Sequence, residues 1–273
     1  MNNNISLTGG MRESLYSIQL SNSLLETIGN RLSTGKKVNS VLDDPINYYR
    51  AKEHRDRAAD LMVRKDEMSE AVQTIKEGTT GIESLENLVD TAKSLATSAM
   101  SADTTVEINN LESQFNALMT QIDELASDSG YKGINLLDGT DDTLKVSFDE
   151  TGDSAVTLTG FDGSASGLGL STLSTNDWTT ASNITDSISE LDSAKTTLRS
   201  ESKTLSTNLN TIKIRQDFTD KTIKNLNDGS DNLILADMDE EAANYLAVQT
   251  QQALARNTLS LASQNAQSVL RLF

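Results

Sequence analysis

The chain of 273 residues is long enough for one or two domains with an apolar core, yet only 4% of it is aromatic and it holds a single proline. This composition suits long, closely packed helices and is unusual for a catalytic α/β domain. The formal net charge of −17 argues against nucleic acid or an anionic membrane as partner, because both bind basic surfaces, and the absence of cysteine excludes disulfides and thiolate chemistry.

The acidic charge is concentrated in the middle of the chain. Residues 61–232 hold 29 acidic and 13 basic side chains, whereas 1–60 hold 7 and 8 and 233–273 hold 4 and 2. Nearly neutral ends can pack against copies of themselves at little electrostatic cost, while an acidic middle stays solvated. No apolar run approaches the ~20 residues of a membrane span, and the N-terminus lacks the basic and apolar regions of a cleaved secretory signal.

The first predicted helix runs from about Ser6 to Leu32, with apolar residues three, four or seven positions apart. Thr34-Gly35 predicts the C-terminal end of this helix. In the linker that follows, Asp43 and Asp44 precede Pro45, and Asp44 then Pro45 is typical of an N-cap followed by the first position of a helix.

From Pro45 a long helix is expected to reach about Met100, because two apolar ladders repeat every seven residues along it. The first ladder holds Leu61, Met68, Ile75, Ile82, Val89 and Ala96, and the second Ala71, Gly78, Leu85, Ala92 and Ala99. Another helix follows Asp103 and ends at Ser129-Gly130. Residues 130–177 are rich in Gly, Asp, Ser and Thr, and two short alternating stretches, 144–148 and 156–158, predict a small β excursion.

Helix is expected again from near Thr180, with a break at Asn227–Asp231 and a last helix from near Asn232. Both ends of the chain then carry apolar faces that need partner helices. We therefore expect residues 5–32 and 246–273 to pack between subunits and to fold on assembly. The candidate self-assembly residues are Leu15, Ile18, Leu25, Leu32, Val248, Leu259, Val269, Leu270 and Phe273.

No segment of the sequence is a strong candidate for a catalytic, metal-binding or phosphate-binding site. His54, the only histidine, lies in a mixed-charge helical stretch and cannot build a zinc site without further His or Cys. Asp141-Asp142 and Asp149-Glu150 lack any calcium-loop spacing and are interpreted as solvated loop acids. Gly167-Leu168-Gly169 lacks the rest of a phosphate-binding motif. We expect no enzyme activity, no catalytic residues, no metal and no cofactor.

Three segments carry a resemblance to a known family. Asn30–Ser40, which reads NRLSTGKKVNS, continues to Asp43-Asp44 and resembles the N-terminal signature of bacterial flagellins. Ser129–Leu137 resembles the turn "FNGxxLL" of that family, and the stretch from Ala236 to Phe273 resembles its C-terminal helix. The match covers about 1–140 and 180–273.

The resemblance implies a subunit of the extracellular flagellar filament, exported without a cleaved signal peptide. It implies a mainly α fold, in which long coiled-coil-like helices from both chain halves surround a small central β-hairpin region. Residues 1–42 and 233–273 would form the inner coiled-coil domain, and 43–232 a rod-shaped domain with its excursion at about 130–177. The implied partners are further copies of the chain, a possible second flagellin, an export chaperone on the C-terminal segment, and the hook-associated and cap proteins.

One stretch departs from the family. Many relatives carry a "RVRELA"-like segment that a vertebrate innate receptor recognises, and here the corresponding region holds Val89, Lys93 and Leu95. One basic residue of the segment is lost, and Lys93 cannot make the planar bidentate contacts of arginine. The sequence therefore predicts weak recognition by that receptor.

Two alternatives stay open on sequence alone. A hook-associated junction protein would share the architecture but occupy a few positions without polymerising. A surface module that binds glycans would use the acidic middle, with Phe161 and Trp178 as the aromatic residues nearest the Gly/Asp-rich loop.

Overall fold

The computed structural model describes residues 9–139 and 142–272, without side-chain detail at 269–272. Contacts divide the chain into two compact units, one of residues 57–224 and one of residues 1–56 with 225–273. The predicted fold class, mainly α with a small hairpin, is confirmed. In chain order the elements are α1 (Gly9–Thr34), α2 (Pro45–Met100), α3 (Thr105–Asp128), β1 (Thr143–Ser147), β2 (Ala155–Thr159), the 3-10 helix η1 (Asp177–Thr179), α4 (Ala181–Ile234) and α5 (Met238–Leu272).

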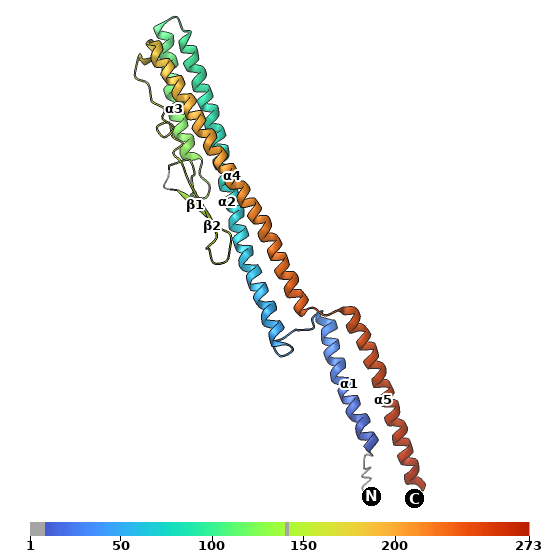
Figure 1. Cartoon of the computed structure of the whole chain (residues 1–273). Coiled ribbons are helices and arrows are strands. Elements are labelled where there is room, and N and C mark those ends of the chain that lie inside the picture. The colour runs from blue at the N-terminus through green and yellow to red at the C-terminus, as the bar shows by residue number, and fades with distance from the viewer. Residues whose placement is uncertain (1–8, 140–141, 273) are drawn as a thin grey trace. The chain divides into compact units, whose positions relative to one another are not determined.

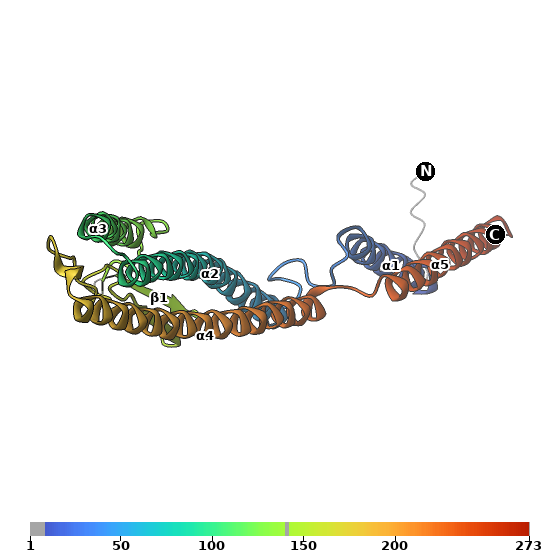
Figure 2. The ribbon, with the colours of Figure 1, turned by 90° about the horizontal axis from the view of Figure 1, so that it is seen from above.

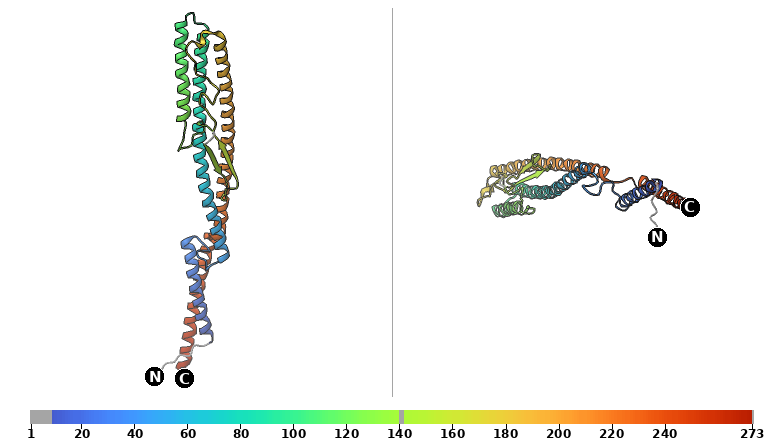
Figure 3. Two further views of the ribbon diagram at one scale, coloured as in Figure 1. Left: turned by 90° about the vertical axis from the view of Figure 1, so that its left-hand side faces the viewer. Right: turned by 90° about the horizontal axis from the view of Figure 1, so that it is seen from below.

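The unit of residues 57–224 is built on α2, α3 and α4, which lie side by side in the order α3, α2, α4 (Figures 2 and 3). Its core is formed by the ladders that the seven-residue spacing predicts, because a stripe of that period stays on the face turned to a neighbouring helix. Fully buried large side chains that α2 and α4 contribute to this core are Met68, Ile75, Ile82, Leu85, Leu191, Leu198 and Ile212. Figure 1 shows α2 and α4 running alongside each other.

The predicted break at Asn227–Asp231 is wrong, because α4 continues through these residues to Ile234. Ser230 is fully buried, and its hydroxyl donates to the carbonyl oxygen of Ala51 at 3.1 Å. Asp231 pairs with Arg55 at 3.3 Å. Asparagine, aspartate, glycine and serine favour breaks in isolation, but here their small side chains are accommodated by contacts with the start of α2.

The chain turns instead at 235–237. The carbonyl oxygen of Ile234 accepts from the backbone N–H groups of Lys37 and Val38 at 2.8 and 3.2 Å, and Ala236 N–H donates to the Gly35 carbonyl at 3.0 Å. Gly35 has φ +69°, the left-handed conformation that ends α1 and favours glycine. The linker after α1 thus supplies the donors that the end of α4 lacks.

The β excursion is a hairpin in which β1 and β2 pair antiparallel, with Thr143 opposite Thr159 and Ser147 opposite Ala155. It agrees within a few residues with the predicted strands. Figure 3 shows it beside α2 and α4. Two arginines hold it there: Arg57 of α2 pairs with Glu150 at 2.5 Å, and Arg215 of α4 lies 5.3 Å from the centre of the Phe148 ring.

The segment that returns from the hairpin to α4 is bound to α3 by three polar side chains. Asp123 accepts from Ala165 N–H at 2.8 Å, and Asn116 both accepts from and donates to the backbone of Leu173. Buried Glu112 accepts from the N–H groups of Asn176 at 3.0 Å and Trp178 at 2.6 Å. These contacts give the backbone of an irregular segment the partners that burial requires.

The single tryptophan, Trp178, anchors this segment in the core. It is 1% exposed, and its ring meets that of Phe115 edge-on at 4.9 Å between centres. Its indole N–H donates to the Ser187 hydroxyl at 3.1 Å. The tryptophan is therefore a structural residue, and its buried ring offers no face to a glycan.

The turn after α3 is fixed by Asn135. Its side-chain amide donates to the carbonyl oxygens of Ala126 and Ser127, at 2.8 and 2.9 Å, and so caps the end of the helix. The turn packs against α2 at Gly81, where a Cβ would lie 2.6 Å from the Ser129 hydroxyl oxygen. Glycine at this position lets the turn and the helix approach closely.

Candidate functional site

Six of the nine predicted self-assembly residues lie along the seam between α1 and α5, which pack against each other (Figure 1). The side chain of Arg31 pairs with Glu241 at 2.9 Å, and Gln252 donates to Asn22. These two contacts define an antiparallel register that places Leu25 near Val248. In that seam Val248 is buried, while Leu15, Ile18, Leu25, Leu32 and Leu259 are half-buried.

Three of the predicted residues cannot be placed in this seam. The side chains of Val269 and Leu270, and the whole of Phe273, lie outside the described residues.

A second apolar face on α1 points outward and was not picked out by the sequence analysis. Tyr16, Leu20 and Leu24 are spaced by four residues, and their exposed fractions are 69%, 61% and 45%. At 3.6 residues per turn Tyr16 and Leu20 lie roughly 160° and 120° around the helix from the face that buries Met11 and Ile28, and Leu24 lies at the border between the two faces. α1 is therefore apolar on two sides, and within a single chain only one of them is covered.

The helix α5 has the same two-sided character. Leu246, Leu254 and Leu261 are each about 60% exposed and lie on the side away from buried Val248 and Gln252. Contiguous exposed apolar side chains of this size mark interaction surfaces. The signal was present in the sequence as a second leucine spacing, but periodicity alone does not tell which face meets which partner.

The linker between α1 and α2 has a defined conformation. The carboxylate of Asp43 accepts from the backbone N–H groups of Asn39 and Ser40 at 3.0 and 2.8 Å, and these hydrogen bonds hold the pKa of Asp43 below its usual value. Asp44 accepts from Asn47 N–H at 3.0 Å and so caps α2, whose first residue is Pro45. The linker is thus a hydrogen-bonded turn that leads into the capped first turn of α2.

Comparison with known proteins then decides the family. The profile of the bacterial flagellin N-terminal helical region matches residues 7–142, and that of the bacterial flagellin C-terminal helical region matches 181–273. The chain belongs to the bacterial flagellin family. It is accordingly a structural subunit of the extracellular flagellar filament.

Relatives of this flagellin match along its whole length. Flagellin FljM of Caulobacter vibrioides is 30% identical over 273 residues, covering 99% of this chain and 98% of that protein. A flagellin of Brucella melitensis is 26% identical over 269 residues, or 95% of each chain. The crystal structure of Bacillus cereus flagellin aligns with a TM-score of 0.48 and 18% identity over 56% of this chain and 88% of that one.

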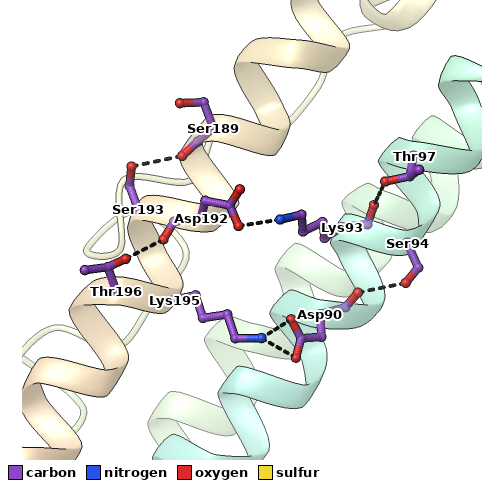
Figure 4. Close-up of polar contacts among 9 residues, drawn as sticks. All are labelled: Asp90, Lys93, Ser94, Thr97, Ser189, Asp192, Ser193, Lys195 and Thr196. Carbon is purple, nitrogen blue, oxygen red and sulfur yellow. Dashed lines mark hydrogen bonds and ion pairs between the residues drawn. The ribbon is translucent and has the colours of Figure 1, made fainter.

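In this flagellin the segment that resembles the receptor-binding stretch of relatives forms ion pairs within the chain. Figure 4 shows two reciprocal ion pairs between α2 and α4: Lys93 binds Asp192 at 2.5 Å, and Lys195 binds both carboxylate oxygens of Asp90. Val89 is only 1% exposed and belongs to the core of the 57–224 unit. Lys93 and Leu95 remain partly exposed.

The other candidate sites of this flagellin show structural contacts. His54 is half-buried and lies against Gly229, while the Asp149 carboxylate accepts from the Thr151 hydroxyl at 2.7 Å in the hairpin turn. Asp141 lies outside the described residues, and Asp142 accepts from Asn135 N–H at 2.8 Å. Among the residues that the structure describes, no group of three or more His, Asp or Glu is placed to hold a metal ion, and no helix is long and apolar enough to cross a membrane.

Proposed function

We propose that this flagellin polymerises through the outward apolar faces of its two terminal helices. We call them the α1 outer face (Tyr16, Leu20, Leu24) and the α5 outer face (Leu246, Leu254, Leu261). The observation that carries the proposal is that these six side chains stay 45–69% exposed although α1 and α5 already pack against each other. The function of the chain is then assembly for motility, and it involves no catalysis.

The energetics favour assembly. Full burial of one large apolar side chain contributes about 1.5–3 kcal/mol, so six that become half-buried contribute roughly 5–9 kcal/mol per subunit. That is comparable to the cost of immobilising a subunit, which is about 4–15 kcal/mol. The predicted seam residues, such as Leu25 and Val248, act earlier in this scheme, by holding α1 and α5 together so that both outer faces are presented.

The test is to place a charge on each outer face. Leu20→Asp and Leu254→Asp each introduce a carboxylate that assembly would bury, so we expect no filaments by electron microscopy under conditions where the unchanged chain forms them. Val106→Asp is the matched control, because Val106 is 72% exposed but lies in the first turn of α3, where an acidic residue is favourable. Normal filaments from both Leu variants would contradict the proposal.

A second test concerns the free subunit. Two helices that bury a single seam are marginal by themselves, so we expect limited proteolysis of the monomer to remove α1 and α5 before it cuts the 57–224 unit. Polymerisation should protect the same helices. Terminal helices that resist the protease as well as α2 and α4 do in the monomer would contradict the coupling of folding to assembly.

The finer assignments are proposals of the same kind. Residues 1–42 and 233–273 form the assembly domain, and 43–232 the rod-shaped domain. The export chaperone covers the C-terminal segment, where the α5 outer face is exposed before assembly, and export needs no cleaved signal. Hook-associated and cap proteins contact the ends of the polymer. Extensive polymerisation of the purified chain without hook would distinguish it from a junction protein.

A further inference from the structure

Two cavities flank the linker between α1 and α2, and the residues that line them all belong to the unit of residues 1–56 and 225–273. The first cavity has a volume of about 350 Å³ and the second about 270 Å³. Lys36 and Asn39 line both, and we call the pair of cavities the linker pocket. The basic side chains that line it are Arg31, Lys36, Lys37, Lys52 and Arg55. Cavities of this size lie near the lower end of the range of small-molecule sites, which is about 300–1,000 Å³.

The linker pocket is basic although the chain as a whole is strongly acidic. Residues 31–56 hold six Lys and Arg and four Asp and Glu, against 23 and 40 in the whole chain. Three basic side chains and one acidic side chain line each cavity, and the acidic residues are Asp43 in the first and Asp56 in the second. Oδ2 of Asp43 already accepts from the backbone N–H groups of Asn39 and Ser40. The pocket therefore carries more positive charge than its own carboxylates neutralise.

The basic side chains of the pocket differ in how far the chain itself uses them. Arg31 and Arg55 form ion pairs at 2.9 and 3.3 Å, and Lys37 donates to a backbone carbonyl oxygen at 3.2 Å. Within the described parts of the chain, by contrast, the ammonium groups of Lys36 and Lys52 form neither an ion pair nor a hydrogen bond. An ammonium group has three donors and no acceptor, so an anion is the ligand that these two groups can bind.

Packing of the linker on α2 brings the two lysines to one site. The buried cluster that holds the linker there consists of Val38, Ala51 and Ile234. Tyr48, Lys52 and Arg55 follow one another at spacings of four and three residues, so they share one face of α2 and line the same cavity. Lys36 reaches that cavity from the linker. The lysines thus come from two segments whose relative position is fixed by buried contacts.

We propose that the linker pocket binds a small polyanion that carries at least two phosphate groups, either inorganic or as a phosphate ester. Lys36 lies between the two cavities, with Lys52 in one and Arg31 in the other, so two linked phosphate groups match this arrangement. Lysine and arginine both donate charge-assisted hydrogen bonds to phosphate oxygens, and the side-chain amide of Asn39 adds two further donors. The site does not depend on the polymerisation proposed above.

The test is a calorimetric titration of the full chain with inorganic tripolyphosphate at low ionic strength, because salt screens exposed charges. We expect saturable binding of one tripolyphosphate per chain. Lys36→Gln/Lys52→Gln should weaken binding about tenfold, which is the effect of two exposed charge contacts. Lys76→Gln/Lys203→Gln is the matched control, because it removes the same charge from exposed positions of the 57–224 unit, and it should change the affinity less than about twofold.

A single side chain tests the site without a change of size. Asn39→Asp places a carboxylate beside both cavities, so we expect it to abolish tripolyphosphate binding, whereas Asn39→Gln should keep it. Both titrations are made with monomer and with filaments, since we expect α1 to become fully ordered on assembly. Binding to either form with this pattern supports the site. Absence of saturable binding to both forms overturns it.

Three ligands separate the sources of phosphate. If tripolyphosphate and ATP without magnesium bind equally, the pocket reads phosphate groups alone. If ATP binds more tightly and Tyr48→Ala removes the difference, the ligand is a nucleotide whose base contacts the ring of Tyr48. Citrate that binds as tightly as tripolyphosphate overturns the assignment to phosphate. An equal loss in the lysine variant and its control overturns the pocket itself, and in each case assembly through the terminal helices is unaffected.

Discussion

Replacement of Glu112 should destabilise the 57–224 unit more than replacement of any charged residue on the surface of α3 does. Glu112 is 3% exposed, and its carboxylate accepts from two backbone N–H groups, at 3.0 Å from Asn176 and 2.6 Å from Trp178. Hydrogen bonds to a charged group contribute about 1.5–3 kcal/mol each, so Glu112→Ala should lower the free energy of unfolding by roughly 3–6 kcal/mol. Glu112→Gln should cost about half as much, because its amide oxygen can still accept one bond.

The assay is urea unfolding followed by tryptophan emission. Trp178 is the only tryptophan and is buried against Phe115, so its emission reports on this region. The difference in the free energy of unfolding follows from the midpoint and the slope of each curve. Glu124→Ala is the control, because Glu124 is exposed on the same helix. A loss below about 1 kcal/mol for Glu112→Ala, or one equal to that of the control, would refute the assignment.

Three further predictions concern other parts of the chain. Gly81→Ala should lower the free energy of unfolding by about 1–3 kcal/mol, because the added Cβ would overlap the turn after α3. Gly78→Ala, whose added Cβ would have its nearest neighbour at 3.4 Å, should leave the free energy of unfolding unchanged or raise it by up to ~1 kcal/mol, and urea titrations that rank the two variants equally would contradict this. The pKa of Asp43 is lowered on folding, so its ionised carboxylate stabilises the fold above about pH 4, and this stabilisation is lost as the pH falls through the folded-state pKa. The NMR shifts of the Asn39 and Ser40 amides should follow that titration, and Asp43→Asn should abolish it. Because Lys93 is bound to Asp192 and is not arginine, an innate-receptor reporter assay should respond weakly, and a response equal to that of an arginine-bearing relative would refute this.

The core of the 57–224 unit was predictable from the sequence because its signal is periodic. Ladders such as Ile75, Ile82 and Val89 keep one face of α2 apolar over many turns, and all three are buried. A stripe of that length has no stable arrangement other than packing against another helix. The hairpin was predictable for the same reason, since strand alternation is also a local signal.

The polar contacts that order the irregular segments could not be predicted. Glu112, Asn116 and Asp123 read as a solvated face of α3, and only the fold brings the backbone of 165–178 across them. The wrong break at Asn227–Asp231 has the same origin. Ser230 disfavours a helix in isolation, but a hydrogen bond to Ala51, which is 179 residues away along the chain, stabilises it there.

The terminal helices show the limit of periodicity most clearly. The sequence predicted that α1 and α5 need partner helices, but the partner can be the other terminal helix on one face and a second subunit on the other face. Leu25 and Val248 lie in the seam within the chain, whereas Leu20 and Leu254 lie outside it. A helix with apolar residues on both sides buries only one of its two apolar faces in the monomer, so burial of the other face favours polymerisation. The same two helices therefore complete their packing only when the subunit enters the filament, which would join the last step of folding to assembly.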